Sequence, residues 1–218
     1  MDEPRDLTVG NWTLKIRVPD GSGLHPVIFL IHGWTGDEKS MWVFAYRLPR
    51  TSLLIAPRAP YVSRHPEIGG YSWVKERGQS FSSLEMFQPA INSFNSLITD
   101  LSNQLPGNFE QFALVGFSQG AAFSFAYAMN NPSTVSKLAA LAGFLPADSD
   151  KQLEALASIP VYIAHGTTDG TVPIAMAREA RADLEAIGAH VTFCESETGH
   201  KLGANCAKQL SGFFSQGN

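Results

Sequence analysis

Short apolar runs recur along the chain and indicate buried β-strands. From residue 26 onward most of these runs are nearly continuous rather than alternating with polar residues. Continuous apolar runs are typical of parallel strands that helices cover on both faces. The predicted strands are residues 12–18, 26–31, 52–56, 111–115, 137–141, 160–164 and 190–194.

Segments with helical periodicity separate these strands. An apolar stripe follows Pro89 as far as residue 105, and we expect this proline in the first helical turn, where its missing N–H costs little. Residues 121–129 predict a buried helix of small residues, and Pro173 begins a helix that Gly188 ends. A last helix has Cys206, Leu210, Phe213 and Phe214 on its inner face. This alternation predicts a doubly wound, mostly parallel α/β sheet of about seven strands.

Two stretches do not fit the alternation. Residues 57–86 contain three prolines and three glycines and show weak periodicity. A loop of this length in a compact domain is usually functional, so we expect it to cover a site. Residues 144–158 form a shorter irregular stretch, in which Leu153, Leu156 and Ile159 predict a brief helix.

Length and charge limit the classes of function. The 218 residues suit one domain, and 44% hydrophobic against 17% charged residues argues against disorder. Lys and Arg number 16 and Asp and Glu number 20, so the formal net charge is −4. Without concentrated positive charge, binding of nucleic acid is not expected.

Targeting and cysteine signals are sparse. No apolar window reaches the length of a membrane span, and the acidic first six residues lack the features of a signal peptide. The two cysteines, Cys194 and Cys206, do not make a disulfide framework or a zinc site, and we expect both to be small buried hydrophobes. A cytoplasmic location is the simplest interpretation, although a secreted protein without its signal would look the same.

The strongest chemical motif is Gly116-Phe117-Ser118-Gln119-Gly120, between a predicted strand and a predicted helix. This is the strand–turn–helix setting of a nucleophile elbow, in which the serine stands clear of the sheet and the glycines remove colliding side chains. The alternative is a glycine-rich turn whose serine only caps the helix. We therefore predict Ser118 as the nucleophile.

A nucleophilic serine needs a base, which follows it in this architecture. Only His165, His190 and His200 follow Ser118. His190 falls in a predicted strand and His165 ends one, which favours structural roles for both. His200 lies in a polar loop between the last strand and the last helix, so it is the predicted base.

Asp169 is the predicted acid that orients the base. It follows the predicted strand at 160–164 and therefore lies at the same sheet edge as Ser118 and His200. The alternative for Asp169 is a turn-forming role. Asp148 and Asp150 are rival acids, which we interpret as solvated charges.

A second glycine-containing loop, residues 31–37, follows the predicted strand at 26–31. Such a loop supplies one donor of an oxyanion hole, and the residue after the nucleophile supplies the other. The predicted donors are the backbone N–H groups of Trp34 and Gln119, with Thr35 as the alternative to Trp34. His32 is expected to fix this loop by hydrogen bonds.

Several aromatic residues are candidates either for the cleft or for the core. They are Trp34, Trp73, Phe117 and Phe144, and we assign Trp73 and Phe144 to the substrate pocket. No spacing of His, Cys, Asp or Glu matches a metal site, and no glycine-rich phosphate loop with a lysine occurs.

Together these motifs resemble the α/β-hydrolase superfamily, and more closely its small phospholipase/carboxylesterase branch, which includes acyl-protein thioesterases and bacterial carboxylesterases. The spacing of 51 residues from Ser118 to Asp169 and 31 from Asp169 to His200 is similar to that branch. Ala121 stands where the branch often has a second glycine, and Trp34-Thr35 where it commonly has Leu-Gly. The matching segments are residues 29–37, 56–60, 116–122, 165–173 and 199–200.

The resemblance implies one α/β-hydrolase domain over residues 1–218 without a separate cap, and an ester or thioester hydrolase without a metal or organic cofactor. We expect a serine carboxylesterase for short- to medium-chain esters. The alternatives are an acyl-thioesterase or lysophospholipase, and a hydrolase-fold binding protein without activity. The expected partner is a small-molecule ester, with no nucleic acid and no membrane span, and the chain is expected as a monomer or homodimer.

Overall fold

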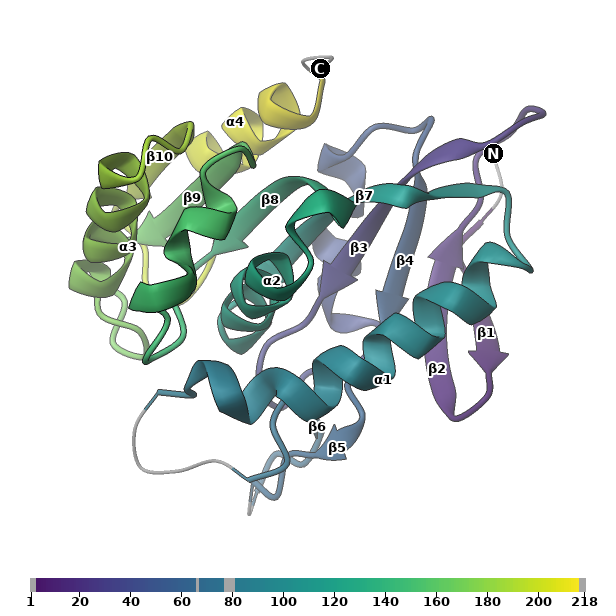
Figure 1. The fold of residues 1–218 in the computed structure, drawn as a ribbon, viewed down its shortest axis with the longest axis horizontal. Coiled ribbons are helices and arrows are strands. Elements are labelled where there is room, and N and C mark those ends of the chain that lie inside the picture. The colour runs from purple at the N-terminus through teal and green to yellow at the C-terminus, as the bar shows by residue number, and fades with distance from the viewer. Residues whose placement is uncertain (1–2, 66, 77–80, 216–218) are drawn as a thin grey trace.

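A central sheet of eight strands organises the molecule (Figure 1). The computed structural model describes residues 3–65, 67–76 and 81–215. The sheet order is β1-β2-β4-β3-β7-β8-β9-β10. The strands are β1 (Arg5–Val9), β2 (Trp12–Arg17), β3 (His25–Ile31), β4 (Leu53–Pro57), β7 (Gly107–Phe117), β8 (Val135–Leu141), β9 (Val161–Gly166) and β10 (Val191–Ser196).

The strand directions confirm the mostly parallel sheet that the continuous apolar runs predicted. From β4 to β10 every neighbouring pair is parallel, whereas β2 pairs antiparallel with β1 and β4. All seven predicted strands are present. The eighth, β1, was not predicted because it is short and mostly exposed, and such an edge strand carries no continuous apolar run.

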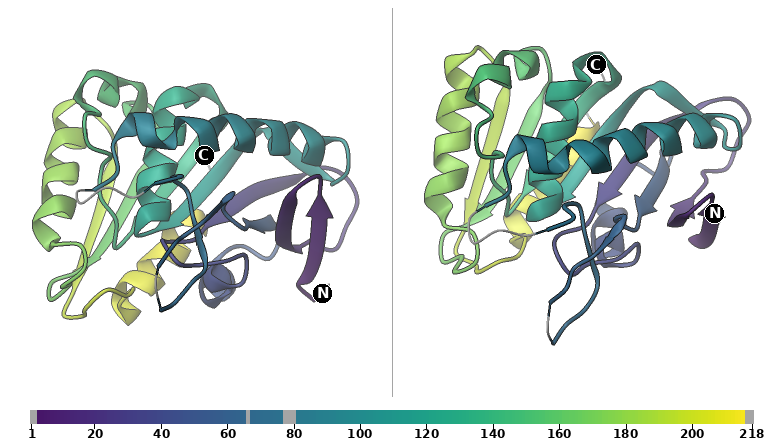
Figure 2. Two further views of the ribbon diagram at one scale, coloured as in Figure 1. Left: turned by 90° about the horizontal axis from the view of Figure 1, so that it is seen from below. Right: turned by 60° about the horizontal axis from the view of Figure 1, so that its bottom comes forward.

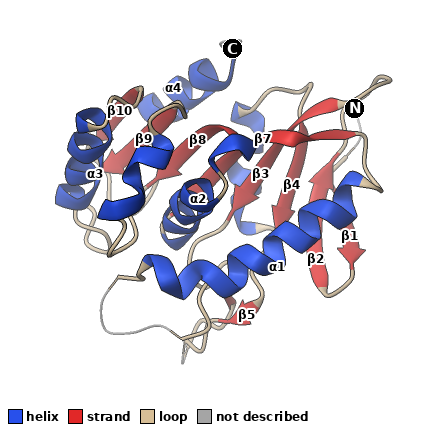
Figure 3. Cartoon of the chain, viewed as in Figure 1, coloured by secondary structure: helices blue, strands red, loops and turns tan. Residues whose placement is uncertain are grey.

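Helices cover both faces of the sheet (Figures 1 to 3). On one face lie α1 (Leu84–Ser102), α2 (Gln119–Asn130), α3 (Ile174–Ala186) and the 3₁₀ helix η3 (Asp150–Leu156). On the other face lie α4 (Ala204–Ser215) and the 3₁₀ helix η1 (Ser40–Arg47), and a short turn, η2 (Pro132–Thr134), precedes β8. The buried apolar residues accordingly form two clusters, one on each side of the sheet.

The start of α1 differs from the prediction. Pro89 lies inside this helix rather than in its first turn, because the helix already begins at Leu84. Ser83 takes the extended N-cap conformation, and the N–H of Leu84 donates to the carbonyl of Ala147 at 3.0 Å. This contact comes from a distant part of the chain, so periodicity around Pro89 does not reveal it.

The long irregular stretch at residues 57–86 contains a small antiparallel hairpin. Its strands are β5 (Tyr61–Val62) and β6 (Tyr71–Ser72), which form a separate two-stranded sheet. Residues 66 and 77–80 of this stretch lie outside the described part of the chain. The brief helix predicted within 144–158 is confirmed as η3.

Candidate active site

Ser118 lies in a strained turn between β7 and α2. Its backbone has φ 54° and ψ −120°, a conformation that side-chain-bearing residues rarely adopt. The turn is possible because Gly116 and Gly120 pack against backbone. A Cβ on Gly120 would collide with the carbonyl oxygens of Ile31 and His32, and one on Gly116 would collide with Gly120. Strain of about 1–3 kcal/mol at such a residue is typical of functional positions.

His200 and Asp169 meet at the carboxyl ends of β9 and β10. The Nδ1–H of His200 donates to Oδ2 of Asp169 at 2.7 Å. The other carboxylate oxygen, Oδ1, accepts the N–H groups of Thr171 at 2.8 Å and Val172 at 3.0 Å. The Asp169 side chain is fully buried, and that of His200 is 24% exposed. Because Nδ1 carries the proton in this bond, Nε2 of the neutral His200 ring is left as a proton acceptor.

The surroundings of Asp169 keep it ionised. Burial alone raises the pKa of this carboxyl, but the hydrogen bonds from His200, Val172 and Thr171 outweigh burial, so the pKa lies below its ordinary value. The charged form can therefore stabilise an imidazolium at His200 when one develops.

A second imidazole contacts the same carboxylate. His165 Nε2 lies 3.4 Å from Asp169 Oδ2 and 2.9 Å from the carbonyl of Val172, to which it donates. Burial lowers the pKa of His165, so the ring is neutral near pH 7. From the sequence we expected a structural role for His165, and its hydrogen bond to the Val172 carbonyl agrees with this. The additional contact with Asp169 depends on the turn that brings residue 169 back over the end of β9.

The other candidate acids and bases lie elsewhere. Asp148 and Asp150 line a separate cavity together with Glu179 and Asp183. His190 is exposed just before β10, and its described hydrogen bond is a backbone one, from the N–H of Val161.

The loop after β3 packs directly against Ser118. A Cβ on Gly33 would lie 3.2 Å from Ser118 Cβ, so this glycine permits the close approach. The N–H of Thr35 donates to the carbonyl of Tyr71 at 2.9 Å, so the alternative oxyanion donor is already engaged. Gln119 is the first residue of α2, where the N–H is not needed for helical hydrogen bonds.

His32 fixes this loop from within the core. Its Nδ1–H donates to the carbonyl of Gly33 at 2.7 Å, and its Nε2 accepts the N–H of Ala59 at 2.9 Å. The ring is fully buried, and burial lowers its pKa to about 4. His32 therefore holds the loop in its neutral form, in agreement with the role expected from the sequence.

The irregular stretch 57–86 supports the same loop from outside. The N–H of Tyr71 donates to the carbonyl of Gly36 at 3.0 Å. Arg58 donates to the buried carboxylate of Glu38 at 2.7 and 3.1 Å and to the Tyr71 hydroxyl at 3.2 Å. The hairpin is thus tied to the candidate oxyanion loop by backbone pairing and by a charged side chain.

Two cavities meet at Ser118 and His200. The larger, of about 640 Å³, lies beside η1 and the start of α4, and its apolar lining comes from Trp34, Met41, Val43, Phe44, Tyr46, Phe117, Leu202 and Ala207. The smaller, of about 330 Å³, lies beneath the hairpin, and its lining includes Trp34, His65, Ile68, Phe81, Phe144 and Val172. Trp34, Thr35, Ser118 and His200 line both cavities, so a substrate can extend from Ser118 in two directions.

The two predicted pocket aromatics differ in position. Phe144 lines the smaller cavity, where its ring lies 4.6 Å from that of Phe81. Trp73 is instead a core residue. It is completely buried, stacks on Phe123 at 4.3 Å, and donates from Nε1 to the carbonyl of His32 at 2.8 Å. A tryptophan with a buried partner for its N–H suits the core, and the sequence alone could not show that partner.

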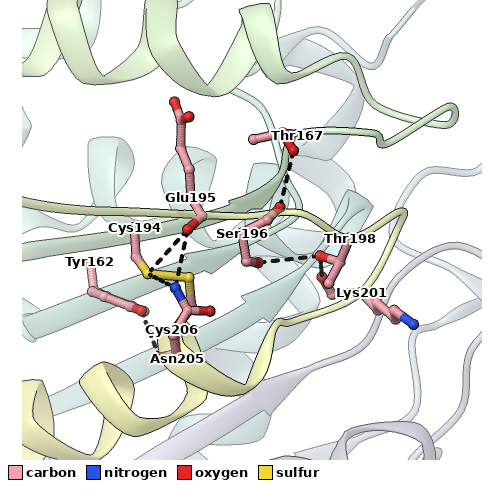
Figure 4. Close-up of a disulfide and its surroundings, with 9 residues drawn as sticks. All are labelled: Tyr162, Thr167, Cys194, Glu195, Ser196, Thr198, Lys201, Asn205 and Cys206. Carbon is pink, nitrogen blue, oxygen red and sulfur yellow. Dashed lines mark hydrogen bonds between the residues drawn. A yellow bond between two sulfur atoms is a disulfide. The ribbon is translucent and has the colours of Figure 1, made fainter.

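The expectation for the cysteines was incomplete. Both are buried, as predicted, but Cys194 in β10 and Cys206 in α4 form a disulfide with a Cα–Cα distance of 5.6 Å (Figure 4). Their separation of 12 residues does not indicate pairing by itself, because pairing requires α4 to fold back along β10.

Across residues 3–65, 67–76 and 81–215, no group of three or more His, Cys, Asp or Glu side chains is placed to hold a metal ion. In the same part of the chain, no helix combines the length and apolar character needed to cross a membrane.

The sheet order, the elbow after β7, and the acid and histidine at the same sheet edge define the α/β-hydrolase fold, here without a separate cap among the described residues. Within that fold, the chain belongs to the phospholipase/carboxylesterase family, whose model matches residues 16–216.

Solved structures show the same fold at low sequence identity. A carboxylesterase from Mesorhizobium loti has a TM-score of 0.80 and 20% identity, covering 98% of this chain and 99% of that chain. The Bacillus cereus carboxylesterase has a TM-score of 0.77 and 17% identity, covering 94% of this chain and 94% of that chain. Acyl-protein thioesterase 2 from Zea mays has a TM-score of 0.70 and 18% identity, covering 93% of this chain and 97% of that chain. No curated protein sequence matches the chain.

Proposed function

We propose that this hydrolase is a serine carboxylesterase that acts through an acyl-enzyme. The observation that carries the proposal is that Ser118, on its strained turn, and His200, which is bonded to the buried Asp169, line the same two cavities. A nucleophile, a base and an orienting acid in this order and architecture are the parts that serine acyl transfer requires.

In the proposed mechanism, Ser118 Oγ attacks the ester carbonyl while His200 Nε2 takes the hydroxyl proton. Asp169 holds the ring in the tautomer that leaves Nε2 free for this step and stabilises the imidazolium that forms. His200 then gives the proton to the leaving alcohol. Water, deprotonated by His200, attacks the acyl group and releases Ser118.

The negative charge that develops on the carbonyl oxygen requires donors. We assign this role to the backbone N–H groups of Trp34 and Gln119. The close packing of Gly33 on Ser118 supports the assignment of Trp34, and the position of Gln119 at the N-terminus of α2 supports the other donor. The Gln119 side chain accepts the N–H of Trp73 at 3.0 Å, which holds the first turn of α2 in place. Removing one such donor typically lowers kcat by about 10²–10³-fold.

Short- to medium-chain acyl groups fit this site best. The larger cavity is apolar, but its rim residues Val43 and Tyr46 are 63% and 70% exposed. A methylene contributes about 0.8 kcal/mol only when it is fully buried, and carbons lying along this rim stay partly in water. We therefore propose that kcat/KM is highest for acyl chains of roughly two to six carbons and falls beyond them.

The second candidate function is an acyl-thioesterase or lysophospholipase. The volume of about 640 Å³ and the apolar lining of the larger cavity favour it, because a longer chain has room there. A binding protein without activity is the least supported, because the nucleophile, base and acid are all present.

The proposed partner is a small-molecule ester, and the proposed state is a monomer or homodimer. The sequence favoured a cytoplasmic location. The Cys194–Cys206 disulfide weighs against this, because disulfides persist mainly in oxidising compartments.

A substrate panel tests the proposal. Nitrophenyl esters of increasing acyl length, acyl-CoA thioesters and lysophospholipids are assayed with the wild-type protein, with and without EDTA. The proposal expects a maximum at short nitrophenyl esters, no effect of EDTA, and no increase in rate above the micellar threshold. A maximum at twelve or more carbons, or a preference for thioesters or lysolipids, establishes the second candidate instead. Absence of turnover on every substrate contradicts both.

A further inference from the structure

The loop that carries His200 has little packing of its own. From Glu195 to Leu202 every residue is exposed or half-buried, and the half-buried Leu202 packs against the core at the end of this segment. Gly199, next to His200, is loosely packed, because a Cβ there would meet nothing closer than 3.9 Å, whereas Gly203 is buried against the side chain of Ser196. The ring of His200 contacts Asp169 and Phe117, and beyond these contacts its position depends on how the two ends of the loop are held.

The first end is held by the sheet. Ser196 pairs with Gly166 in the parallel register of β10 on β9. The N–H of Thr167 donates to Ser196 O at 2.8 Å, and the N–H of Thr168 donates to Thr198 O at 3.1 Å. These bonds connect the start of the loop to the turn that carries Asp169.

The second end depends on α4, which is a surface helix with three buried residues, Cys206, Ala207 and Leu210. Two hydrogen bonds fix its first turn: Asn205 Nδ2 donates to Glu195 O at 3.2 Å, and the buried Tyr162 hydroxyl donates to Cys206 O at 2.7 Å. The Cys194–Cys206 bond is the covalent link between this turn and the sheet, and Figure 4 shows it between β10 and α4, alongside these contacts.

We infer that the Cys194–Cys206 disulfide is a positioning element for catalysis, because it closes the loop that holds His200 against Asp169 and Ser118. This inference rests on the proposed function. An error of about 1 Å in the position of a catalytic group can lower the rate by about 10²-fold, so a loop with few core contacts needs its ends fixed. Leu202 and Ala207 line the larger cavity, so the same link also fixes part of the cavity wall.

The primary test is the double variant Cys194→Ala/Cys206→Ala. We expect kcat to fall at least tenfold, with KM changed less than about threefold. We also expect the far-downfield proton resonance of the His200–Asp169 hydrogen bond to broaden or disappear, while the circular dichroism spectrum stays native. The matched control is Leu210→Ala, which weakens the packing of α4 but keeps the link. It should lower the melting temperature and keep kcat within about twofold.

Reduction of the wild-type protein provides a second measurement if the double variant does not fold. A trialkylphosphine and water convert the disulfide into two thiols, and the phosphine supplies both electrons and becomes the phosphine oxide. Because both cysteines are buried, the reduction is followed by counting free thiols. Activity and the downfield resonance should fall in proportion to free thiol and return on reoxidation.

The outcomes separate this inference from the proposed function. If the unlinked protein keeps kcat within twofold of wild type and keeps the resonance, the positioning role is overturned while the esterase proposal stands. If wild type hydrolyses no ester or thioester, the proposed function fails, and the resonance in the linked and unlinked proteins still shows whether the disulfide positions His200. A loss of kcat in Leu210→Ala equal to that of the double variant also overturns the inference.

Discussion

His165 Nε2 lies 3.4 Å from Asp169 Oδ2, the same oxygen that accepts the hydrogen bond from His200. Asp169 therefore lies between two imidazoles, one buried and one facing the cavities. His165 Nδ1 is buried and has no hydrogen-bond partner among the described residues, so a charged ring would place an unsatisfied N–H in the core. In the proposed mechanism, the neutral His165 ring contacts the buried side of Asp169, and the imidazolium forms on His200.

Replacement of His165 tests whether this contact supports the acid. In His165→Leu the carbonyl of Val172 loses a donor and the Asp169 carboxylate loses a packing partner. We expect kcat to fall about tenfold, which corresponds to about 1.4 kcal/mol, with little change in KM. His190→Leu changes an exposed histidine and is the control, expected at wild-type activity. An unchanged kcat in a folded His165→Leu protein contradicts the supporting role.

Asp169→Asn tests the assignment of the acid. The variant should fold, but the amide cannot fix the working tautomer of His200, so kcat should fall by about 10⁴-fold. Asp148→Asn and Asp150→Asn are matched controls, because both residues line the separate acidic cavity, and they should retain activity. The assignment is wrong if either control is inactive while Asp169→Asn remains active.

The buried His32 makes stability depend on pH. Its pKa in the folded state is about 4, below the value of about 6.5 for an unperturbed histidine. The unfolded chain therefore takes up the proton first as pH falls. The stabilisation from neutral His32 is fully present above about pH 6.5 and is lost as pH falls toward about 4, with a total of about 3 kcal/mol.

Urea unfolding of wild type and His32→Gln at pH 7 and pH 4.5 measures this contribution. The glutamine cannot titrate, but its carbonyl oxygen can accept the N–H of Ala59. We expect the free energy of unfolding of wild type to fall by about 2 kcal/mol more than that of the variant between the two pH values. Equal decreases in the two proteins show that His32 does not titrate in this range.

The Glu38–Arg58 pair should matter for both stability and activity. Burial raises the pKa of Glu38, but the hydrogen bonds from Arg58 outweigh burial and lower it overall. In Arg58→Met the buried carboxylate loses its hydrogen-bonded partner, and the exposed Lys39 ammonium at 3.9 Å replaces it poorly, so we expect a loss of about 3 kcal/mol in the free energy of unfolding. Because Arg58 also bonds to Tyr71, kcat/KM should fall as well.

The exposed pair Arg181–Glu185 is the control for that experiment. Both side chains are nearly half exposed, so Arg181→Met should change stability by no more than about 0.5 kcal/mol. Chemical denaturation and ester hydrolysis are measured on both variants. Similar stability losses in Arg58→Met and Arg181→Met contradict a special role for the buried pair.

Much of the fold could be predicted because the buried strands and helices leave clear hydrophobic patterns in the local sequence. Continuous apolar runs mark strands buried on both faces, and the prediction of seven of the eight strands in the large sheet is confirmed. The strand β1 has only Val9 buried, so burial leaves almost no pattern in its sequence. The beginning of α1 depends on the contact of Leu84 with Ala147, which lies far along the chain.

In the candidate site, too, some features follow from local sequence patterns and others depend on how the chain folds back on itself. The placement of Ser118 and His200 at one edge of the sheet could be predicted, because each follows a predicted parallel strand at its carboxyl end. The core position of Trp73, the second contact of His165 and the pairing of Cys194 with Cys206 all depend on tertiary packing. Such contacts are determined by the tertiary fold, so no local sequence pattern indicates them and only the structure could reveal them.

The most direct measurement is active-site labelling with a fluorophosphonate, followed by intact-mass and peptide mass spectrometry, on wild type and Ser118→Ala. Serine acyl transfer predicts one label per chain, located on Ser118, with loss of ester turnover in step with labelling. Ser118→Ala should keep the wild-type melting curve, take up no label and lose at least about 10⁴-fold in kcat. Stoichiometric labelling of another residue, or turnover by Ser118→Ala near the wild-type rate, would contradict the proposed mechanism.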